Sequence, residues 1–379
     1  MPSATDHSAD AAAGREDSAA TPSATRRSRR GHGRTTLADV ALQAQVTKIT
    51  VSRFLREPGK VAPETAQRIR QALVRTGYTP NKQAGLLASG RSGMVAALVP
   101  NLSHSIFGET VQTLSEALQP AGLELLLAAT GYSQAREEEQ LRAVLAWAPA
   151  AIVVTGRRHT AGTMRLLRAA AQAGTPVLEM WDHHPGARAP FAQIGFDHVA
   201  VGQALAQHLL AQGHRQLAYL DSAVAEDFRA HERGAGFAQA VRAAGMGLQR
   251  LQADPGDPFD AGRAALGQIN RRRAGTRSPA RLVSAVACAN DQLACGLMMQ
   301  ALDLGLRLPD ELSVLGFGDF PIGRQLRPAL STVQPPSQAI GQATAHAVLK
   351  ALQQGSAPIS VALPWKLIVR GSCGCRTSA

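Results

Sequence analysis

Residues 36–90 read TLADVALQAQVTKITVSRFLREPGKVAPETAQRIRQALVRTGYTPNKQAGLLASG, and this stretch decides the fold of the first domain. Thr36 stands three residues before Asp39, a spacing typical of a helix start. A second helix is expected to start at Thr47. Pro63 suits the first turn of a third helix, and Gly77 suits the left-handed residue that ends it. The apolar residues expected to close the small core are Leu37, Val40, Ala41 and Ala44 in the first helix and Ile69, Leu73 and Val74 in the third.

The second helix, expected from Thr47 to Arg56, has two different faces. By helical period, Val51, Phe54 and Leu55 fall together, and the side chains that lie opposite them are Lys48, Ile49, Ser52, Arg53 and Arg56. Two short helices joined by a tight turn form a helix-turn-helix, whose second helix can lie in the major groove of DNA. The sequence therefore predicts that this helix recognises DNA.

Three motifs at consistent spacing resemble the headpiece of the lactose-repressor (LacI/GalR) family of regulators: Thr36-Leu-x-Asp39-Val-Ala41, Val46-Thr-x-x-Thr50-Val-Ser52-Arg53-x-Leu55 and Gly77-Tyr78-x-Pro80-Asn81. The resemblance implies DNA contacts from Thr36, Thr47, Lys48, Ile49, Thr50, Ser52, Arg53, Arg56, Lys60, Asn81, Ala84 and Leu87. It also implies a hinge helix over 81–89 that folds on operator binding. In that helix Leu87 would wedge between base pairs of the minor groove, and Ala84 would permit close approach of the partner hinge.

Positive charge is concentrated in this part of the chain. Residues 26–90 hold thirteen Lys and Arg against three acidic residues, a net of +10 out of the +12 of the whole chain. Such a footprint indicates a polyanion partner, and the helical motifs favour duplex DNA over RNA or a membrane surface. Residues 1–33 are expected to form a disordered basic tail. The basic segment at its end, 26–34, either adds phosphate contacts or only keeps the chain in solution.

The remaining composition is that of a globular chain in a reducing compartment. With 379 residues, 45% hydrophobic and 18% charged, the chain should form more than one domain. It has no apolar run of about eighteen residues that could span a bilayer. Four cysteines are too few for a disulfide framework, so a cytoplasmic location is expected. Cys288 and Cys295 are expected in the core. Cys373 and Cys375 could bind a metal or be redox-active, but the lack of nearby ligands favours an ordinary role.

From residue 92 onward, apolar strands alternate with helices, a pattern typical of a mostly parallel sheet covered on both faces. Strands are expected at 94–99, 123–129, 151–155, 177–181, 217–220, 283–288 and 313–317. One helix is expected to begin at residue 107 and a separate one to end at 147. Further helices are expected at 163–172, after 197, at 233–244, at 259–272 and from 337. Two successive rounds of this pattern imply two doubly wound lobes with a cleft at the carboxyl ends of the strands.

This second part is similar to the periplasmic-binding-protein-like core of the same family. The residues that carry the resemblance are Gly213-His214-Arg215, Arg233-x-x-Gly236-Phe237, Cys288-Ala-Asn290-Asp291-x-x-Ala294-x-Gly296, Pro309-x-x-Leu312-Ser-Val-x-Gly316-Phe317 and Leu330-Ser-Thr332-Val. The expected organisation is a disordered tail (1–33), an all-α helix-turn-helix domain (34–80), a hinge helix (81–91) and a two-lobed α/β core for effector binding and dimerisation (92–379).

The loops that follow the strands are where an effector would bind. The candidate residues are Ser103, Tyr132, Thr155, Arg157, His159, Glu179, Asp182, Arg233, Asn290 and Asp319. The resemblance implies that Arg233 and Asn290 hold effector oxygens and that Asp182 lies near another such position. An arginine fork suits a carboxylate or phosphate, although Arg233 could instead be a helix-surface residue. His159 either lies exposed in its loop or helps Arg157 to hold an anion.

The type of effector is indicated by a departure from the family pattern. Many sugar-responsive relatives carry Asp directly after the Gly-Phe pair, where this chain has Gly318 and then Asp319. Together with Tyr132, Arg157, His159 and residues 179–182, this looks most like the gluconate-utilisation repressor branch. A sugar acid is therefore the preferred ligand, rather than a neutral sugar.

Two other classes of protein are less consistent with the sequence. It contains no Walker loop, dinucleotide-binding glycine motif, nucleophile elbow or zinc-protease motif, so neither an enzyme nor a cofactor is expected. A solute-binding protein would use the same core, but the basic headpiece and the lack of an apolar signal segment oppose it. The expected protein is a homodimeric repressor on a roughly palindromic operator, whose hinges change when an effector moves the lobes.

Overall fold

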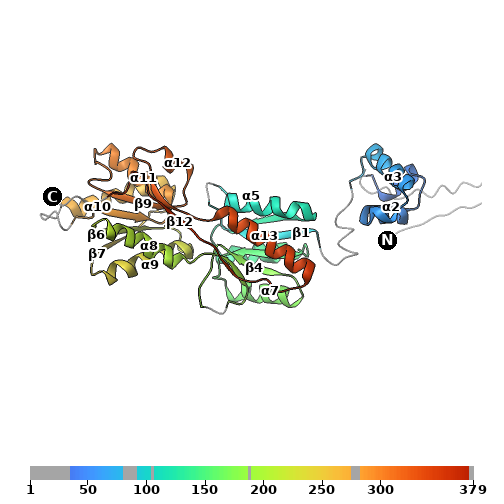
Figure 1. The fold of residues 1–379 in the computed structure, drawn as a ribbon, viewed down its shortest axis with the longest axis horizontal. Helices are drawn as coiled ribbons and strands as arrows, with labels where there is room; N and C mark the ends of the chain where they lie inside the picture. The colour runs from blue at the N-terminus through green and yellow to red at the C-terminus, as the bar shows by residue number, and fades with distance from the viewer. Residues whose placement is uncertain (1–34, 80–91, 104–105, 187–188, 275–281, 375–379) are drawn as a thin grey trace, which may run out of the picture. The chain divides into compact units, whose positions relative to one another are not determined.

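The computed structural model of this chain describes residues 35–79, 92–103, 106–186, 189–274 and 282–374 (Figure 1). The expected tail and hinge helix lie outside the described residues, and so do Asn81, Ala84 and Leu87. The chain divides into two compact units, Met1–Asn81 and Lys82–Ala379. Each unit has its own hydrophobic core.

Within its described residues 35–79, the first unit contains three α-helices, α1 (Leu37–Gln43), α2 (Lys48–Arg56) and α3 (Pro63–Thr76), which confirms the sequence prediction. The Asp39 carboxylate accepts hydrogen bonds from the backbone nitrogen and the hydroxyl of Thr36, both at 2.8 Å, and this fixes the start of α1. Gly77 ends α3 with φ +59°, a left-handed conformation that suits glycine.

The core of this unit differs from the prediction at one position. Val40, Val51 and Ile69 are fully buried, as expected, but Val74 is 83% exposed. Successive residues of a helix are about 100° apart around its axis, so Val74 lies roughly 140° away from Ile69. The buried face of α3 is instead completed by two small residues, Ala66 and Ala72.

The second unit contains two six-stranded sheets, one in each lobe. The order in the first lobe is β11-β5-β4-β3-β1-β2, and every neighbouring pair is parallel. Its strands are β1 (Met94–Val99), β2 (Glu124–Ala129), β3 (Ala151–Thr155), β4 (Val177–Met180), β5 (Ala192–Gly195) and β11 (Val361–Ala362).

The order in the second lobe is β12-β10-β9-β8-β6-β7, and only β12 is antiparallel to its neighbour. Its strands are β6 (Gln216–Asp221), β7 (Gly247–Gln252), β8 (Ala285–Cys288), β9 (Ser313–Phe317), β10 (Ser331–Gln334) and β12 (Lys366–Ile368).

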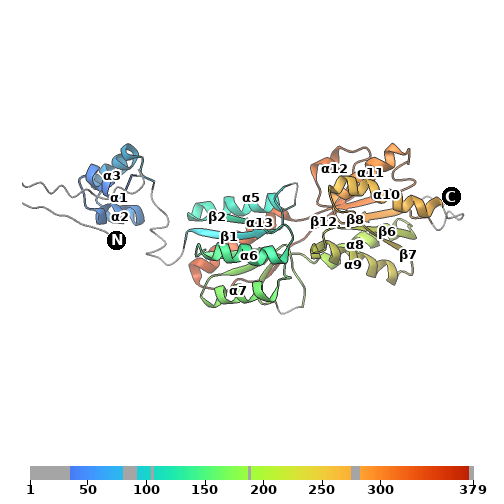
Figure 2. The ribbon, with the colours of Figure 1, turned by 180° about the vertical axis from the view of Figure 1, so that it is seen from behind.

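Helices cover both faces of each sheet (Figures 1 and 2). In the first lobe, α5 (Phe107–Leu118) and α13 (Ser337–Gln354) lie on one face, and α6 (Gln134–Leu145) and α7 (Ala161–Gln172) lie on the other. In the second lobe, α8 (His198–Ala211) and α9 (Phe228–Ala243) lie opposite α10 (Pro258–Ala274), α11 (Asp291–Asp303) and the short α12 (Pro321–Gln325). This confirms the predicted architecture of two doubly wound lobes.

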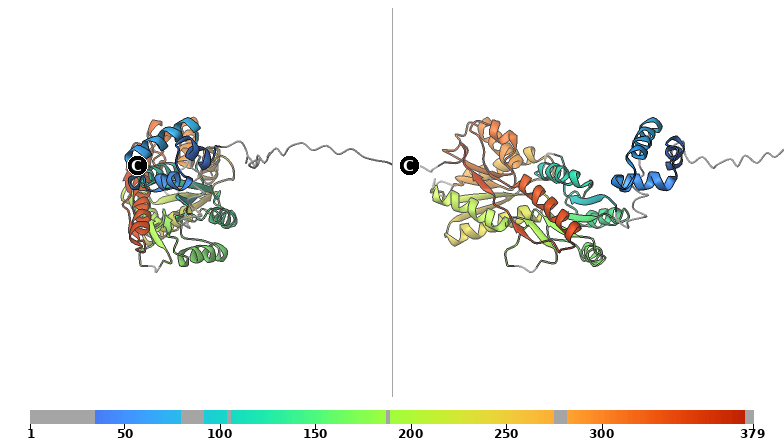
Figure 3. Two further views of the ribbon diagram at one scale, coloured as in Figure 1. Left: turned by 90° about the vertical axis from the view of Figure 1, so that its right-hand side faces the viewer. Right: turned by 45° about the vertical axis from the view of Figure 1, so that its right-hand side comes forward.

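The lobes are not two successive rounds of the chain, however. The chain enters the second lobe after β5, returns to the first after β10 and crosses again between β11 and β12. Helix α13 therefore packs against α5, far away in sequence, as the right-hand view of Figure 3 also shows. Gly341 permits this close packing, because a Cβ there would lie 2.6 Å from the Thr110 carbonyl oxygen. Three crossovers thus connect the lobes.

Candidate functional site

The outward face of α2 is polar and basic except at one position. Lys48, Arg53 and Arg56 are exposed, and the apolar side chain of Ile49 is 71% exposed. The Thr47 hydroxyl accepts a hydrogen bond from the Thr50 backbone nitrogen at 3.2 Å, which caps the helix. An exposed β-branched apolar side chain beside basic ones suits contact with a thymine methyl group within the major groove.

The other predicted DNA contacts of this unit flank the helix. Thr36 is exposed at the start of α1, Thr50 and Ser52 are half-buried, and Lys60 pairs with Glu57 at 2.6 Å. Both side chains of that pair are more than half exposed, so the pair is weak and leaves Lys60 able to exchange Glu57 for a phosphate.

A cleft with a volume of about 500 Å³ opens between the two lobes of the second unit. Its first-lobe walls include Ser103, Phe107 and Tyr132, and its second-lobe walls include Asn290 and Phe317. It lies beyond the carboxyl ends of β1, β8 and β9, the edge where open α/β sheets bind ligands.

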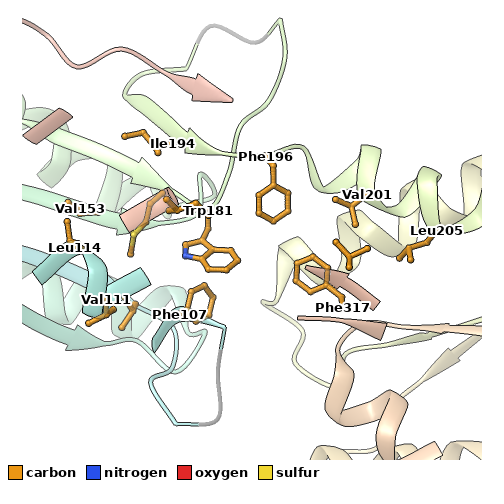
Figure 4. Close-up of a cluster of buried hydrophobic side chains, with 14 of the residues drawn as sticks. Phe107, Val111, Leu114, Val153, Trp181, Ile194, Phe196, Val201, Leu205 and Phe317 are labelled. Atoms are coloured by element: carbon orange, nitrogen blue, oxygen red, sulfur yellow. The ribbon is translucent and has the colours of Figure 1, made fainter. Parts of the chain in front are cut away.

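One side of this cleft is built on an aromatic cluster that joins the lobes (Figure 4). The rings of Phe107 and Trp181 meet edge to face at 5.0 Å between centroids. Trp181 also contacts Phe196 at 6.1 Å, and Phe196 contacts Phe317 of the second lobe at 6.3 Å. Because Phe196 lies on the first crossover, the cluster places the cleft directly beside the point where the lobes are hinged.

Arg233 lies at this aromatic cluster and is only 4% exposed. Its Nη2 donates to the Ala289 carbonyl oxygen at 2.8 Å, and its guanidinium carbon lies 3.7 Å from the centre of the Phe317 ring. Its Nη1 lies 3.1 Å from Nδ1 of His198. Nε has no hydrogen-bond partner within the described residues. The structure therefore fixes Arg233 in the cleft wall, which excludes the alternative of a helix-surface arginine.

His198 supports Arg233 in one tautomer. Its Nε2 lies 2.8 Å from the Trp181 carbonyl oxygen, which can only accept, so Nε2 carries the proton. Nδ1 is then free to accept the hydrogen bond from Arg233. Burial, reinforced by the positive charge of Arg233, holds the pKa of His198 well below its usual value, so the ring stays neutral.

Arg229 is a cleft residue that the sequence reading missed. It lies one turn before Arg233 on α9 and is 8% exposed. Its guanidinium carbon lies 5.5 Å from the centre of the Phe107 ring, and it lines the same cleft as Tyr132. Within the described residues, no carboxylate oxygen lies within 4.0 Å of Arg229 or Arg233. The available signal was the four-residue spacing of two arginines, which places both on one helix face.

A smaller cavity of about 40 Å³ adjoins the cleft and shares Tyr132 and Arg229 with it. Three predicted effector residues line this cavity rather than the main cleft: Thr155, Arg157 and Asp182. Burial raises the pKa of Asp182 to about 6, against the opposing influence of Arg229. Tyr132 adopts φ +62°, and burial raises the pKa of its hydroxyl, so the group remains protonated.

Of the ten predicted effector residues, the cleft itself brings together Ser103, Tyr132, Arg233 and Asn290. Asn290 has a structural role as well, because its side-chain oxygen caps α11 by accepting from the Leu293 backbone nitrogen at 2.9 Å. Its amide group can still donate toward the cleft.

Arg157 and His159 do not form the anion site that the sequence suggested. Arg157 pairs across the lobes with Glu232 at 2.6 Å, and Arg158 joins the same carboxylate at 2.9 Å. The side chain of His159 is fully buried between Glu137 at 2.7 Å and Glu179 at 3.6 Å. Burial alone would lower the pKa of His159, but its hydrogen bond with Glu137 and the nearby carboxylate of Glu179 outweigh this and raise the pKa to about 9.

Glu179 and Asp319 also lie away from the cleft lining. Glu179 is fully buried and accepts a hydrogen bond from Gln193 at 2.8 Å. Asp319 holds Arg324 at 2.5 Å and Arg370 at 2.6 Å, so its carboxylate is already paired. Both residues lie close to the carboxyl end of a strand, but only the fold decides whether such a side chain turns toward the cleft.

The cysteines show no metal centre in the part of the chain that the structure describes. Cys288 and Cys295 are buried core residues, as predicted. Cys373 is buried beside His208 at 3.5 Å, and Cys375 lies outside the described residues. No group of three His, Cys, Asp or Glu side chains within the described ranges is arranged for a metal ion.

Comparison with known proteins agrees with this architecture. Residues 36–81 match the family described as bacterial regulatory proteins, lacI family, and residues 206–373 match the periplasmic binding protein-like domain. The HTH-type transcriptional regulator GntR of Pseudomonas aeruginosa is 37% identical over 84% of this chain and 89% of its own length. The chain belongs to the lacI family of bacterial regulatory proteins.

Two further matches support this assignment. GntR of Escherichia coli is 30% identical over 83% of this chain and 91% of its own length. A lacI-family transcriptional regulator from Silicibacter pomeroyi has a similar structure, with a TM-score of 0.80 and 27% identity over 90% of this chain and 99% of its own. This lacI-family chain is a DNA-binding transcriptional regulator and not an enzyme. Among its described helices, none has the length and apolar character to cross a bilayer.

Proposed function

We propose that this regulator is a repressor whose operator binding is controlled by a sugar acid, of which gluconate is the type, bound in the cleft between the lobes. The observation that carries the effector class is the pair Arg229 and Arg233. Both are more than nine-tenths buried in the cleft wall, and neither has a carboxylate within 4.0 Å among the described residues. A buried charge without a counter-ion is costly, so the cleft favours an anionic ligand.

The rest of the cleft suits the polyhydroxyl part of such a ligand. Ser103, Asn290 and Asp227 supply hydroxyl, amide and carboxylate groups, and the Phe107 and Phe317 rings supply apolar contact. A volume of about 500 Å³ accommodates a six-carbon acid. The two relatives named GntR support the gluconate-utilisation branch as the source of the effector.

At the operator, we propose that two copies of α2 enter successive major grooves, so that a homodimer recognises a roughly palindromic site. Thr47, Lys48, Ile49 and Arg53 lie at the amino-terminal and outward part of α2, which reaches base edges in helix-turn-helix proteins. The proposed hinge helix spans residues 81–89 within the linker 81–91, with Leu87 as its minor-groove wedge and Ala84 at the contact with the partner hinge. Because the operator is chromosomal DNA, we expect the protein to act in the cytoplasm.

The test begins with selection of an operator from random duplex DNA by the full-length protein, followed by gel-shift titration with and without ligand. We expect one palindromic consensus and a change in operator affinity with millimolar gluconate but not with equimolar glucose. Failure to enrich any consensus would refute the DNA-binding assignment of α2. An equal response to glucose would refute the acid effector.

A further inference from the structure

Arg229 and Arg233 share one face of α9, but their surroundings differ. Arg233 is already held by protein groups, since its two terminal nitrogens reach Ala289 and His198 and its plane lies on Phe317. The Phe317 ring and the Ala289 carbonyl belong to the second lobe, as Arg233 itself does. Arg233 is therefore a fixed part of the wall, with much of its donor capacity in use.

Arg229 projects from the second lobe into the first. Its guanidinium faces the Phe107 ring, and it lines the cleft together with Tyr132; both of these residues belong to the first lobe. It also lies against Gly156, at the end of β3, where a Cβ would come within 2.5 Å of Nη1. Gly156 has φ +91°, a backbone conformation that favours glycine.

The charge of Arg229 has no ion-pair partner in this position. Glu232, on the same helix, does form ion pairs, with Arg157 and Arg158 of the first lobe. Asp182 lines the first-lobe wall beside Arg229, and its oxygens lie beyond 4.0 Å from the guanidinium. A guanidinium that is 8% exposed and faces a ligand-sized space therefore keeps a vacant position for an anion.

We propose that Arg229 is the specificity-determining residue of the cleft, which binds the carboxylate of the effector and distinguishes sugar acids from neutral polyols. This inference rests on the proposed function and deepens it. A carboxylate bound there would contact a second-lobe arginine while lying against the first-lobe Tyr132, so charge recognition and contact between the lobes occur at one place. The hydroxyl groups of the ligand would extend toward Arg233 and Asn290.

The proposal is tested by calorimetric titration of the full-length protein with gluconate and with glucitol, the neutral polyol of the same carbon number. The wild-type protein should prefer gluconate by about tenfold or more, as a charge-assisted hydrogen bond allows. Arg229→Gln, which keeps polar donors but loses the charge, should reduce this preference by about tenfold and leave glucitol affinity within about twofold. Arg229→Lys should retain part of the preference, because it keeps the charge but loses the fork.

Arg250→Gln is the matched control. Arg250 lies on β7 of the same lobe, pairs with Asp221 at 3.0 Å and does not line the cleft, so both affinities should stay at wild-type values. Thermal unfolding and operator binding of each variant report whether it folds.

The outcomes separate this inference from the proposed function. If wild-type protein prefers gluconate and Arg229→Gln keeps that preference, Arg229 does not read the charge, although the acid effector stands. If Arg229→Gln weakens both ligands equally, its role is structural and the inference fails. If the wild-type protein does not prefer gluconate over glucitol, both the proposed effector and this inference are wrong.

Discussion

Nη1 of Arg233 donates a hydrogen bond to Nδ1 of His198 at 3.1 Å, and Nε2 of the same ring donates to the Trp181 carbonyl oxygen at 2.8 Å. Arg233 belongs to the second lobe, Trp181 directly follows β4 of the first lobe, and His198 directly follows the first crossover. One neutral imidazole thus connects a cleft residue to both lobes.

His198→Ala should destabilise the second unit by about 1 to 3 kcal/mol, because it leaves a buried donor of Arg233 and a buried carbonyl without partners. Urea unfolding of the full-length chain, followed by circular dichroism, measures this. His346→Ala, at an exposed histidine of α13, is the control and should change the unfolding free energy by less than about 0.5 kcal/mol. Equal effects of the two substitutions would contradict the role given to His198.

Arg233→Ala should weaken both gluconate and glucitol by about tenfold or more, because it removes a fixed wall of the cleft, while the preference for gluconate that Arg229 supplies should persist. Operator affinity without ligand should persist, because α2 lies in the other compact unit. Calorimetry and gel-shift titration on the same preparation check both statements. A loss confined to gluconate would instead assign the charge recognition to Arg233.

Gluconate affinity should fall as pH rises through about 6, the pKa of Asp182. Above that pH the buried carboxylate is ionised and competes for Arg229, while below it the carboxyl is neutral and Arg229 is free for the ligand. Arg157 also favours the ionised form of Asp182, whereas Glu232 and Glu179 oppose it. The neutral His198 ring, 3.6 Å away, adds no charge.

The measurement is a calorimetric series from pH 5 to 8 with wild-type protein and Asp182→Asn. The asparagine variant cannot ionise, so its gluconate affinity should be flat across the range. A pH dependence that survives in Asp182→Asn would show that another group causes it.

Substitutions at Ile49 and Lys48 should change which operator is preferred, since both side chains are exposed at the start of α2. One lost base contact costs about 1 to 3 kcal/mol of discrimination. Selection of random DNA with a two-position library checks this. Lys60→Ala is the control, because loss of a phosphate contact should weaken all sequences alike. An unchanged consensus throughout the library would remove these residues from base recognition.

The sequence predicts the central elements of the fold best. The residue ranges of β1, β3 and β9 were predicted without error because buried parallel strands are continuous apolar runs between turns. β7 was missed, since this edge strand, GLQRLQ, is mostly polar and half-exposed. The sequence of α13 does not indicate which lobe the helix joins, because its position depends on close packing of Gly341 against α5.

The sequence predicts only part of the candidate effector site, because the position of a cleft residue also depends on contacts between distant parts of the chain. The motifs indicate Arg233 and Asn290, whereas Arg229 belongs to no motif, and only the fold shows that it lies between the lobes. His159 and Asp319 stand at strand ends, but ion partners from distant parts of the chain hold them away from the cleft lining. Local pattern indicates which residues can reach a cleft, and tertiary pairing decides which do.

Control of operator binding by a sugar acid in the cleft can be measured by titrating gluconate into the full-length protein with and without saturating operator. Linkage requires that the ratio of the two gluconate dissociation constants equal the ratio of operator dissociation constants with and without gluconate. We predict a ratio of about 5 to 150, with weaker gluconate binding to the operator complex, as in other allosteric proteins. Equal gluconate affinity in the two states would contradict the account.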